Sequence, residues 1–192
     1  MGGYKLNNVY HPKKGYMTDF YRDQFIMYNN IPRKSWVMNL RAQDDQSKPI
    51  YFWQLYSVIG SDCIRNIVTQ FYNNVFQDNK NIWFSSEFKD GGTLEHHVER
   101  QTLFWLDVMG AGKHYKGGKL MLHNHHKLVE SIMNKKGADL WMKHMNNAIQ
   151  TILNKTSFSQ LNQQRIKTSL HEFIFFLMID YSKEFSFQFS KL

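Results

Sequence analysis

Four consecutive residues, His123-Asn124-His125-His126, form the densest group of side chains in this sequence that could ligate a metal. Imidazole binds zinc in sets of three or four ligands, and it binds haem iron as a single axial ligand. The sequence has no pair of cysteines and no His-Glu-x-x-His motif, and no pair of acidic residues lies near the cluster. Two interpretations remain open: one axial histidine that faces a cavity, or a polar helix face exposed to water.

A second polar pair, His97 and Gln101, lies four residues apart and therefore on one face of a helix. Phe104 and Trp105 continue this face with aromatic rings. A polar pair beside an aromatic stripe is found in the wall of a ligand pocket. Taken alone, the same pattern is more often a helix edge beside an ordinary core.

Tyr72 follows Phe71 within an apolar helical stretch, so its hydroxyl is expected near the core, where it needs a hydrogen-bond partner. A bound diatomic ligand, with Gln101 or His97 nearby, would provide that partner. A backbone carbonyl would do so equally well, so the sequence keeps both interpretations.

Helical periodicity begins at Tyr51, and no alternating strand pattern competes with it. A short first helix is expected over 51–59, ending at Gly60, and the next helix carries the apolar positions between Ile64 and Val75. Asp78 to Asn81 is expected to form a polar turn. Further helices are expected over 94–109, 120–129, 137–153 and 159–182. The glycines of Gly110-Ala111-Gly112 should end the helix that precedes them, and the sequence as a whole predicts an all-α domain.

Composition excludes several classes of protein. The chain of 192 residues is 42% hydrophobic and 21% charged, as in ordinary globular domains. The only cysteine, Cys63, excludes an internal disulfide and indicates a reducing compartment. No transmembrane segment or signal peptide is expected, because no apolar run is long enough. The net charge is +8, but the lysines are scattered without a basic run, which disfavours nucleic acid as a partner. The basic balance itself favours a mitochondrial location, with the cytoplasm as the alternative.

Residues 1–48 differ from the rest of the chain. Helical periodicity is weak there, and tyrosines and phenylalanines are spread among Lys, Arg and Asn. We expect an extended N-terminal arm over 1–48, a helical domain over 49–183 and a C-terminal tail over 184–192. An arm so rich in aromatic rings is expected to lie against a protein partner.

The ordered series of motifs from residue 51 to 183 resembles the truncated haemoglobins. Leu55-Tyr-Ser-Val-Ile-Gly60, followed by Phe71-Tyr72, looks like the opening of that family. Asp78 to Phe84 resembles its Asp-Pro…Phe-Phe stretch, with Trp83-Phe84 in place of two phenylalanines. Gln101-x-x-Phe104, residues 108–112 and Tyr115-x-Gly117 resemble its Gln-x-x-Phe…Gly-Gly-Pro…Tyr-x-Gly.

The chain also departs from the pattern of that family. Gly-Ala-Gly replaces Gly-Gly-Pro, and the loop between Phe84 and His97 is longer than usual. The stretch between the histidine cluster and Trp141 is also extended. These differences fall in expected loops, where insertions are tolerated.

The resemblance implies a globin-like fold, the truncated 2-over-2 helical sandwich, that holds haem b. Tyr72 would be the distal tyrosine that hydrogen-bonds the bound ligand, Gln101 the second donor, and His97 a residue at the distal gate. Phe84 would pack on the haem face. The residues implied to line the cavity are Phe104, Trp105 and Trp141.

The implied iron ligand belongs to the histidine cluster. Met121-Leu122-x-x-x-His126 fits the spacing of one group of the family, Met121-x-x-x-His125 that of another, and Tyr115 to His123 that of the third. We favour His126 and then His125.

By the same resemblance the pocket binds a diatomic gas, oxygen or nitric oxide. Enzymatic activity would at most be of the nitric oxide dioxygenase type, and it would need an external reductase, because nothing in the sequence resembles a flavin or nicotinamide domain. The rival interpretation is a globin-fold structural subunit of a large mitochondrial membrane assembly, with haem lost or non-catalytic. The arm over 1–48 suits either version of such a subunit, including a haem-binding globin carried as an accessory subunit of a mitochondrial complex.

Overall fold

The computed structural model describes residues 40–112, 114–115 and 130–190. Most of the expected arm lies outside these residues. So do the helix expected over 120–129 and its histidines, His123, His125 and His126.

Within the described residues the chain forms five α-helices and two 3-10 turns, and no strand. The elements in chain order are η2 (Phe52–Gln54), α2 (Tyr56–Phe76), α3 (Ile82–Asp90), α4 (Leu94–Val108), η3 (Glu130–Ile132), α6 (Lys135–Leu153) and α7 (Gln160–Glu184). The prediction of an all-α domain is confirmed.

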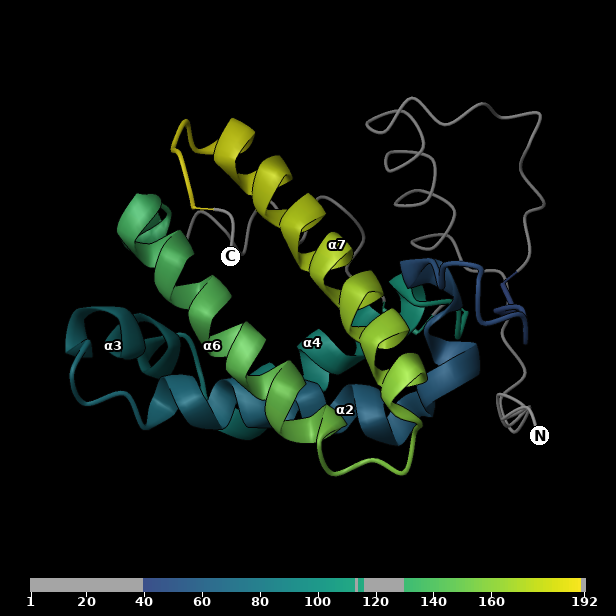
Figure 1. The fold of residues 1–192 in the computed structure, drawn as a ribbon. Helices are drawn as coiled ribbons and strands as arrows, with labels where there is room; N and C mark the ends of the chain where they lie inside the picture. Colours follow the sequence, from purple (N-terminus) through teal and green to yellow (C-terminus); the bar gives the residue numbers. More distant parts are fainter. Residues whose placement is uncertain (1–39, 113, 116–129, 191–192) are drawn as a thin grey trace.

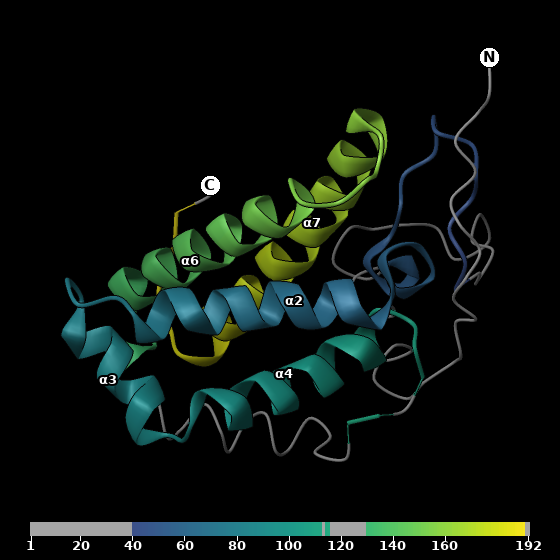
Figure 2. The same ribbon diagram turned by 90° about the horizontal axis from the view of Figure 1, so that it is seen from below.

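The helix α2 lies at the centre of the fold and packs against both α4 and α6, while α6 also packs against α7. Figure 2 shows α2 and α4 side by side, with α6 and α7 on the opposite side of α2 from α4. The short helix α3 lies at one end, where it joins α2 to α4. This arrangement of four long helices agrees with the two-over-two helical sandwich that the resemblance implied.

The core follows the helical periodicity of the sequence. On α2, Ile64, Ile67, Val68 and Phe71 recur at the three- and four-residue spacing of one helix face, and each is at most 1% exposed. The longer helices α6 and α7 bury the same kind of stripe, from Met142 to Leu153 and from Ile166 to Leu177. Each fully buried side chain of this size stabilises the fold by roughly 1.5–3 kcal/mol.

The first predicted helix was partly wrong. Residues 52–54 form the 3-10 turn η2 instead, and α2 begins at Tyr56, but its helical backbone is interrupted at Gly60, where the sequence predicted the end. Gly60 has φ 69° and ψ 176°, so it introduces a kink, which explains why its residue type suggested an end.

The predicted end of α4 at Gly110 is confirmed. Gly110 has φ 100°, and a Cβ atom there would collide with the carbonyl oxygen of Trp53 in η2. Just beside it, the Tyr56 N–H donates to the carbonyl of Met109 at 2.9 Å. The chain therefore leaves α4 through a close backbone contact that only glycine permits.

Arg165 of α7 holds the residues that precede η2. Its buried guanidinium donates to the carbonyls of Lys48 (3.0 Å) and Asp45 (3.2 Å), and to the side chain of Asn162 (3.0 Å). The last residues of the expected arm are therefore packed against the helical domain.

Candidate functional site

A cavity of about 410 Å³ lies where α2, α3, α4, α6 and α7 converge, within the size range of small-molecule and cofactor sites. It brings together five of the seven side chains that the sequence predicted for a ligand pocket in the described part of the chain. They are Tyr72, Phe84, His97, Gln101 and Trp141. They come from the last turns of α2, the first half of α6 and the first turns of α3 and α4.

The two other predicted residues, Phe104 and Trp105, do not line this cavity. Trp105 is fully buried and contacts Phe173 of α7 edge-on, with ring centroids 5.5 Å apart. Phe104 contacts the ring of Tyr115 at 5.8 Å. Both rings belong to the core along α4, and their contact with a cofactor stays a prediction.

The hydroxyl of Tyr72 is the best-placed donor of the cavity. Tyr72 is 6% exposed and lines the cavity, and its hydroxyl has no hydrogen bond to any residue that the structure describes. Burial raises the pKa of this phenol, so the group stays protonated over the physiological range. It is therefore a neutral donor available to a ligand.

His97 packs against this tyrosine. Its imidazole stacks on the Tyr72 ring with centroids 5.1 Å apart and planes 21° apart, and its Nε2 lies 2.7 Å from the carbonyl oxygen of Phe88 in α3. A carbonyl only accepts hydrogen bonds, so Nε2 carries the proton and donates it. Burial lowers the pKa of His97, which favours the neutral ring.

Gln101 follows His97 by one turn of α4 and also lines the cavity. Its half-buried side-chain amide has no hydrogen bond to another residue of the described part of the chain. Arg100 of α4 also borders the cavity, as do Glu87 and Asp90 of α3. Gln101 is thus a second available donor, and Arg100 supplies a permanent positive charge.

Phe84 and Trp141 give the cavity flat aromatic walls. Phe84 is 1% exposed, and its ring stacks against the imidazole of His144 at 6.0 Å with planes 21° apart. Trp141 of α6 contacts Phe71 of α2 at 5.3 Å. The wall formed by Phe84 therefore depends on a histidine of α6 that the sequence did not single out.

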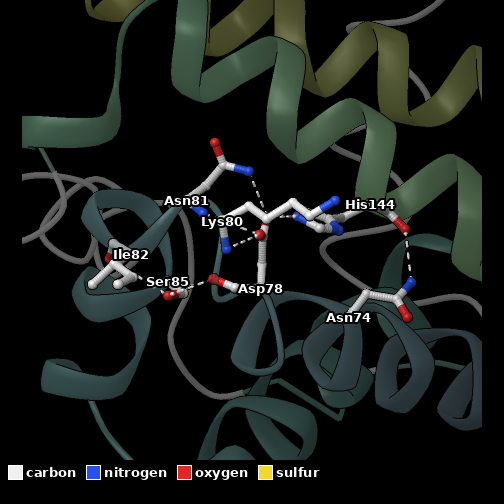
Figure 3. Close-up of polar contacts among 7 residues, drawn as sticks. All are labelled: Asn74, Asp78, Lys80, Asn81, Ile82, Ser85 and His144. Atoms are coloured by element: carbon white, nitrogen blue, oxygen red, sulfur yellow. Dashed lines mark hydrogen bonds and ion pairs between the residues drawn. The ribbon is translucent and has the colours of Figure 1, made fainter.

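The same histidine binds the turn between α2 and α3. His144 Nε2 lies 2.9 Å from Asp78 Oδ2, and the other oxygen, Oδ1, accepts the N–H groups of Lys80 and Asn81 at 3.1 Å each (Figure 3). Burial raises the pKa of Asp78, but hydrogen bonds from Asn81, His144 and Lys80 together lower it by more, so its pKa lies below the ordinary value. The predicted polar turn is confirmed, and half-buried Asp78 holds its hydrogen bonds together.

Tyr181 of α7 is a further cavity residue that sequence reasoning missed. Burial, together with Asp180 and the nearby Tyr72, raises the pKa of its phenol. The periodicity of α7 does not distinguish this position from an ordinary core tyrosine. Its role becomes visible only from its contact with a cavity that other helices build.

Within the described residues no group of three or more His, Cys, Asp or Glu side chains could hold a metal ion. An axial histidine from the cluster at 123–126 would lie outside these residues. The described helices also include none whose length and apolar character would allow it to cross a membrane.

Comparison with known proteins places these features in a family. The model of the family described as bacterial-like globin matches residues 54–175. The matched stretch runs from η2 into α7 and includes every residue predicted for the pocket and for the iron. No match was found among curated proteins.

Proposed function

This chain belongs to the bacterial-like globin family, and we propose that it binds haem b in the cavity where its helices converge and takes oxygen or nitric oxide beside Tyr72. The observation that carries the proposal is the pair of donors, Tyr72 and Gln101. Both border the cavity, and neither has a hydrogen-bond partner among the described residues. Two donors that border one cavity without a partner among these residues can both serve a ligand that accepts hydrogen bonds.

The lining of the cavity fits haem. The rings of Phe84 and Trp141 and the buried side chains of Leu177 and Met178 offer apolar contacts to a flat macrocycle. Arg100 at the border carries a charge that suits a carboxylate, and haem has two. Haem would supply the iron at which a diatomic gas binds reversibly.

The proposed axial ligand is His126, followed by His125 and then His123. Among the described residues His97 is the one imidazole that borders the cavity, and its Nε2 proton is engaged by Phe88. This engagement favours a ligand from the histidine cluster over one from α4.

Tyr72 and Gln101 would donate hydrogen bonds to the gas and slow its release, while the aromatic walls exclude water. Oxidation of nitric oxide to nitrate is an activity that we propose only with electrons from a separate reductase. The chain itself contributes the pocket and its donors.

The absorption spectrum of the full-length protein after haem supplementation tests the proposal. A Soret band is expected, together with its loss in His126→Ala and its retention in His125→Ala. The absence of the band from the wild-type protein would overturn the proposal. If the Soret band is lost only in His125→Ala, His125 is the axial ligand.

We also propose that the protein is carried as an accessory subunit of a mitochondrial complex. The net charge of +8 and the aromatic-rich segment 1–48 favour this proposal. Size-exclusion chromatography of organelle and cytoplasmic extracts tests it, and elution in the mitochondrial fraction at a mass well above the monomer is expected. A cytoplasmic monomer would contradict it. A complex whose subunit carries no haem would favour the purely structural alternative.

A further inference from the structure

We propose that His97 is a positioning residue that holds the phenol of Tyr72 toward the cavity, and that it neither donates to the gas ligand nor swings as a gate. This inference rests on the proposed haem-globin function. It assigns the two donor roles to Tyr72 and Gln101, and it revises the position at the distal gate that the sequence suggested for His97.

The hydrogen-bonding proton of His97 is already in use. The distance of 2.7 Å between its Nε2 and the carbonyl oxygen of Phe88 is that of a short, well-formed hydrogen bond. The neutral imidazole has a single N–H, so it cannot also donate to a ligand in the cavity.

The Phe88 carbonyl needs this bond. It belongs to the last turn of α3, where carbonyl groups have no partner within their own helix. The neighbouring carbonyls of Glu87 and Lys89 accept the N–H groups of Gly91 and Gly92 at 3.1 and 3.4 Å. His97 supplies the donor for Phe88, and a swing of its ring would take this partner away from a half-buried carbonyl.

The ring of His97 also closes one face of Tyr72. The two rings lie nearly parallel at 5.1 Å, while Phe71 and Phe88 meet the Tyr72 ring edge-on at 4.9 and 6.2 Å. Phe76 packs against the outer part of the His97 ring at 6.0 Å. The Tyr72 ring is therefore held between aromatic neighbours, and the direction of its hydroxyl depends on the imidazole that lies against it.

Gln101 provides the contrast. It lies one turn further along α4 and borders the same cavity, yet it makes no hydrogen bond to another described residue. Of the two polar side chains on this face of α4, Gln101 is the one free to donate, and His97 is the one that is tied in place.

The first test needs no haem. Nitrogen NMR of the full-length, haem-free chain with labelled histidine reports which ring nitrogen carries the proton, and the signal missing from His97→Phe assigns the residue. We expect a neutral His97 with a slowly exchanging Nε2 proton. A proton on Nδ1, or rapid exchange with water, would overturn the inference.

The second test uses the haem-loaded protein with carbon monoxide as the probe, because the C–O stretching frequency responds to a hydrogen bond donated to it. His97→Phe keeps a flat ring against Tyr72 and should keep the wild-type frequency. His97→Ala removes the ring and should move the frequency toward that of Tyr72→Phe. His171→Phe is the matched control, since it makes the same substitution at a half-buried histidine outside the cavity lining.

The outcomes separate the two proposals. If the wild-type chain takes up no haem, the proposed function fails, while the NMR measurement still decides how His97 is held. If His97→Phe behaves like Tyr72→Phe, His97 itself donates to the ligand and the inference is wrong. A wild-type frequency in His97→Ala would also overturn it, because Tyr72 would then need no support from the imidazole.

Discussion

A hydrogen bond of 2.9 Å joins the imidazole of His144 to the carboxylate of Asp78, 66 positions away in the chain. The pair joins the middle of α6 to the turn that precedes α3 (Figure 3). Because Asp78 also binds the backbone at the start of α3, and His144 stacks on Phe84, the pair fixes one wall of the cavity relative to another.

We predict that Asp78→Asn destabilises the fold by about 2 kcal/mol, since it weakens several charge-assisted hydrogen bonds at a buried site. Urea unfolding followed by circular dichroism measures the change. The matched control is Asp62→Asn, an exposed position on α2, where we expect a change within about 0.5 kcal/mol.

A double-mutant cycle tests whether His144 is the partner that matters. His144→Phe keeps a ring against Phe84 but removes the bond to Asp78, so Asp78→Asn should cost less in that background than in the wild type. Equal costs in the two backgrounds would show that the pair is not coupled.

Acid should weaken the fold before its carboxylates titrate. Burial lowers the pKa of His97 and of His171 below the ordinary value of 6.5. The unfolded chain therefore binds these protons more readily than the folded one, and the stability they contribute is present above pH 6.5 and lost as the pH falls through the folded pKa values. The lowered pKa values of Asp78 and Asp139 act in the same direction, but only below the ordinary 3.8. Burial raises the pKa of Glu172, which acts in the opposite direction and offsets part of the loss.

The free energy of unfolding of the haem-free chain, measured in urea between pH 7.5 and 5, should thus decrease toward acid, by up to about 1.4 kcal/mol per pH unit for each proton taken up. His97→Phe should show a shallower decrease than the wild type. An identical pH dependence in both proteins would exclude His97 as a contributor.

Helical periodicity predicted most of the fold. The apolar spacing in α2, α4, α6 and α7 depends on neighbours within the same helix, so their extents could be anticipated to within a few residues. The helix α3 was not anticipated, because it is short and half polar and its start depends on the distant partner of Asp78.

The site was predictable only in part. The types and spacing of Tyr72 and Gln101 indicated a pocket, and both lie there. The bond from His97 to the Phe88 carbonyl was invisible in the sequence, since any residue type offers the same backbone acceptor. Phe104 and Trp105 show the opposite difficulty, because an aromatic residue on the expected helix face packs equally well into the core.

Gly137 gives a prediction in which helix propensity and packing disagree. Alanine is favoured over glycine within a helix by about 1 kcal/mol, yet a Cβ atom on Gly137 would collide with the carbonyl oxygen of Ile132, which borders the cavity. We therefore expect Gly137→Ala to destabilise the protein by about 1–3 kcal/mol in urea unfolding.

The comparison for this substitution is Gly91→Ala at the end of α3. Gly91 has φ −76°, which suits any residue, and its nearest atom is the carbonyl of Glu87 in its own helical turn, at 3.2 Å. A smaller effect is expected there. Stabilisation by Gly137→Ala would show that η3 moves freely and does not fix the cavity wall.

The two donors of the cavity should act together on the same ligand. Tyr72→Phe and Gln101→Leu each remove one hydrogen bond while keeping the volume of the side chain, and each should speed the release of oxygen from the haem-loaded protein roughly 10-fold, the effect of losing one good hydrogen bond. Stopped-flow displacement of oxygen by carbon monoxide measures the rates. If both donors contact one gas molecule, the effect in the double variant should exceed the product of the two single effects, since in each single variant the remaining donor can adjust to the loss of the other. The conservative change Gln101→Glu keeps the length of the side chain but replaces the amide donor with a carboxylate, so it should release oxygen at least as fast as Gln101→Leu. Slow release that persists in the double variant would place the ligand away from Tyr72 and contradict the site proposed for it.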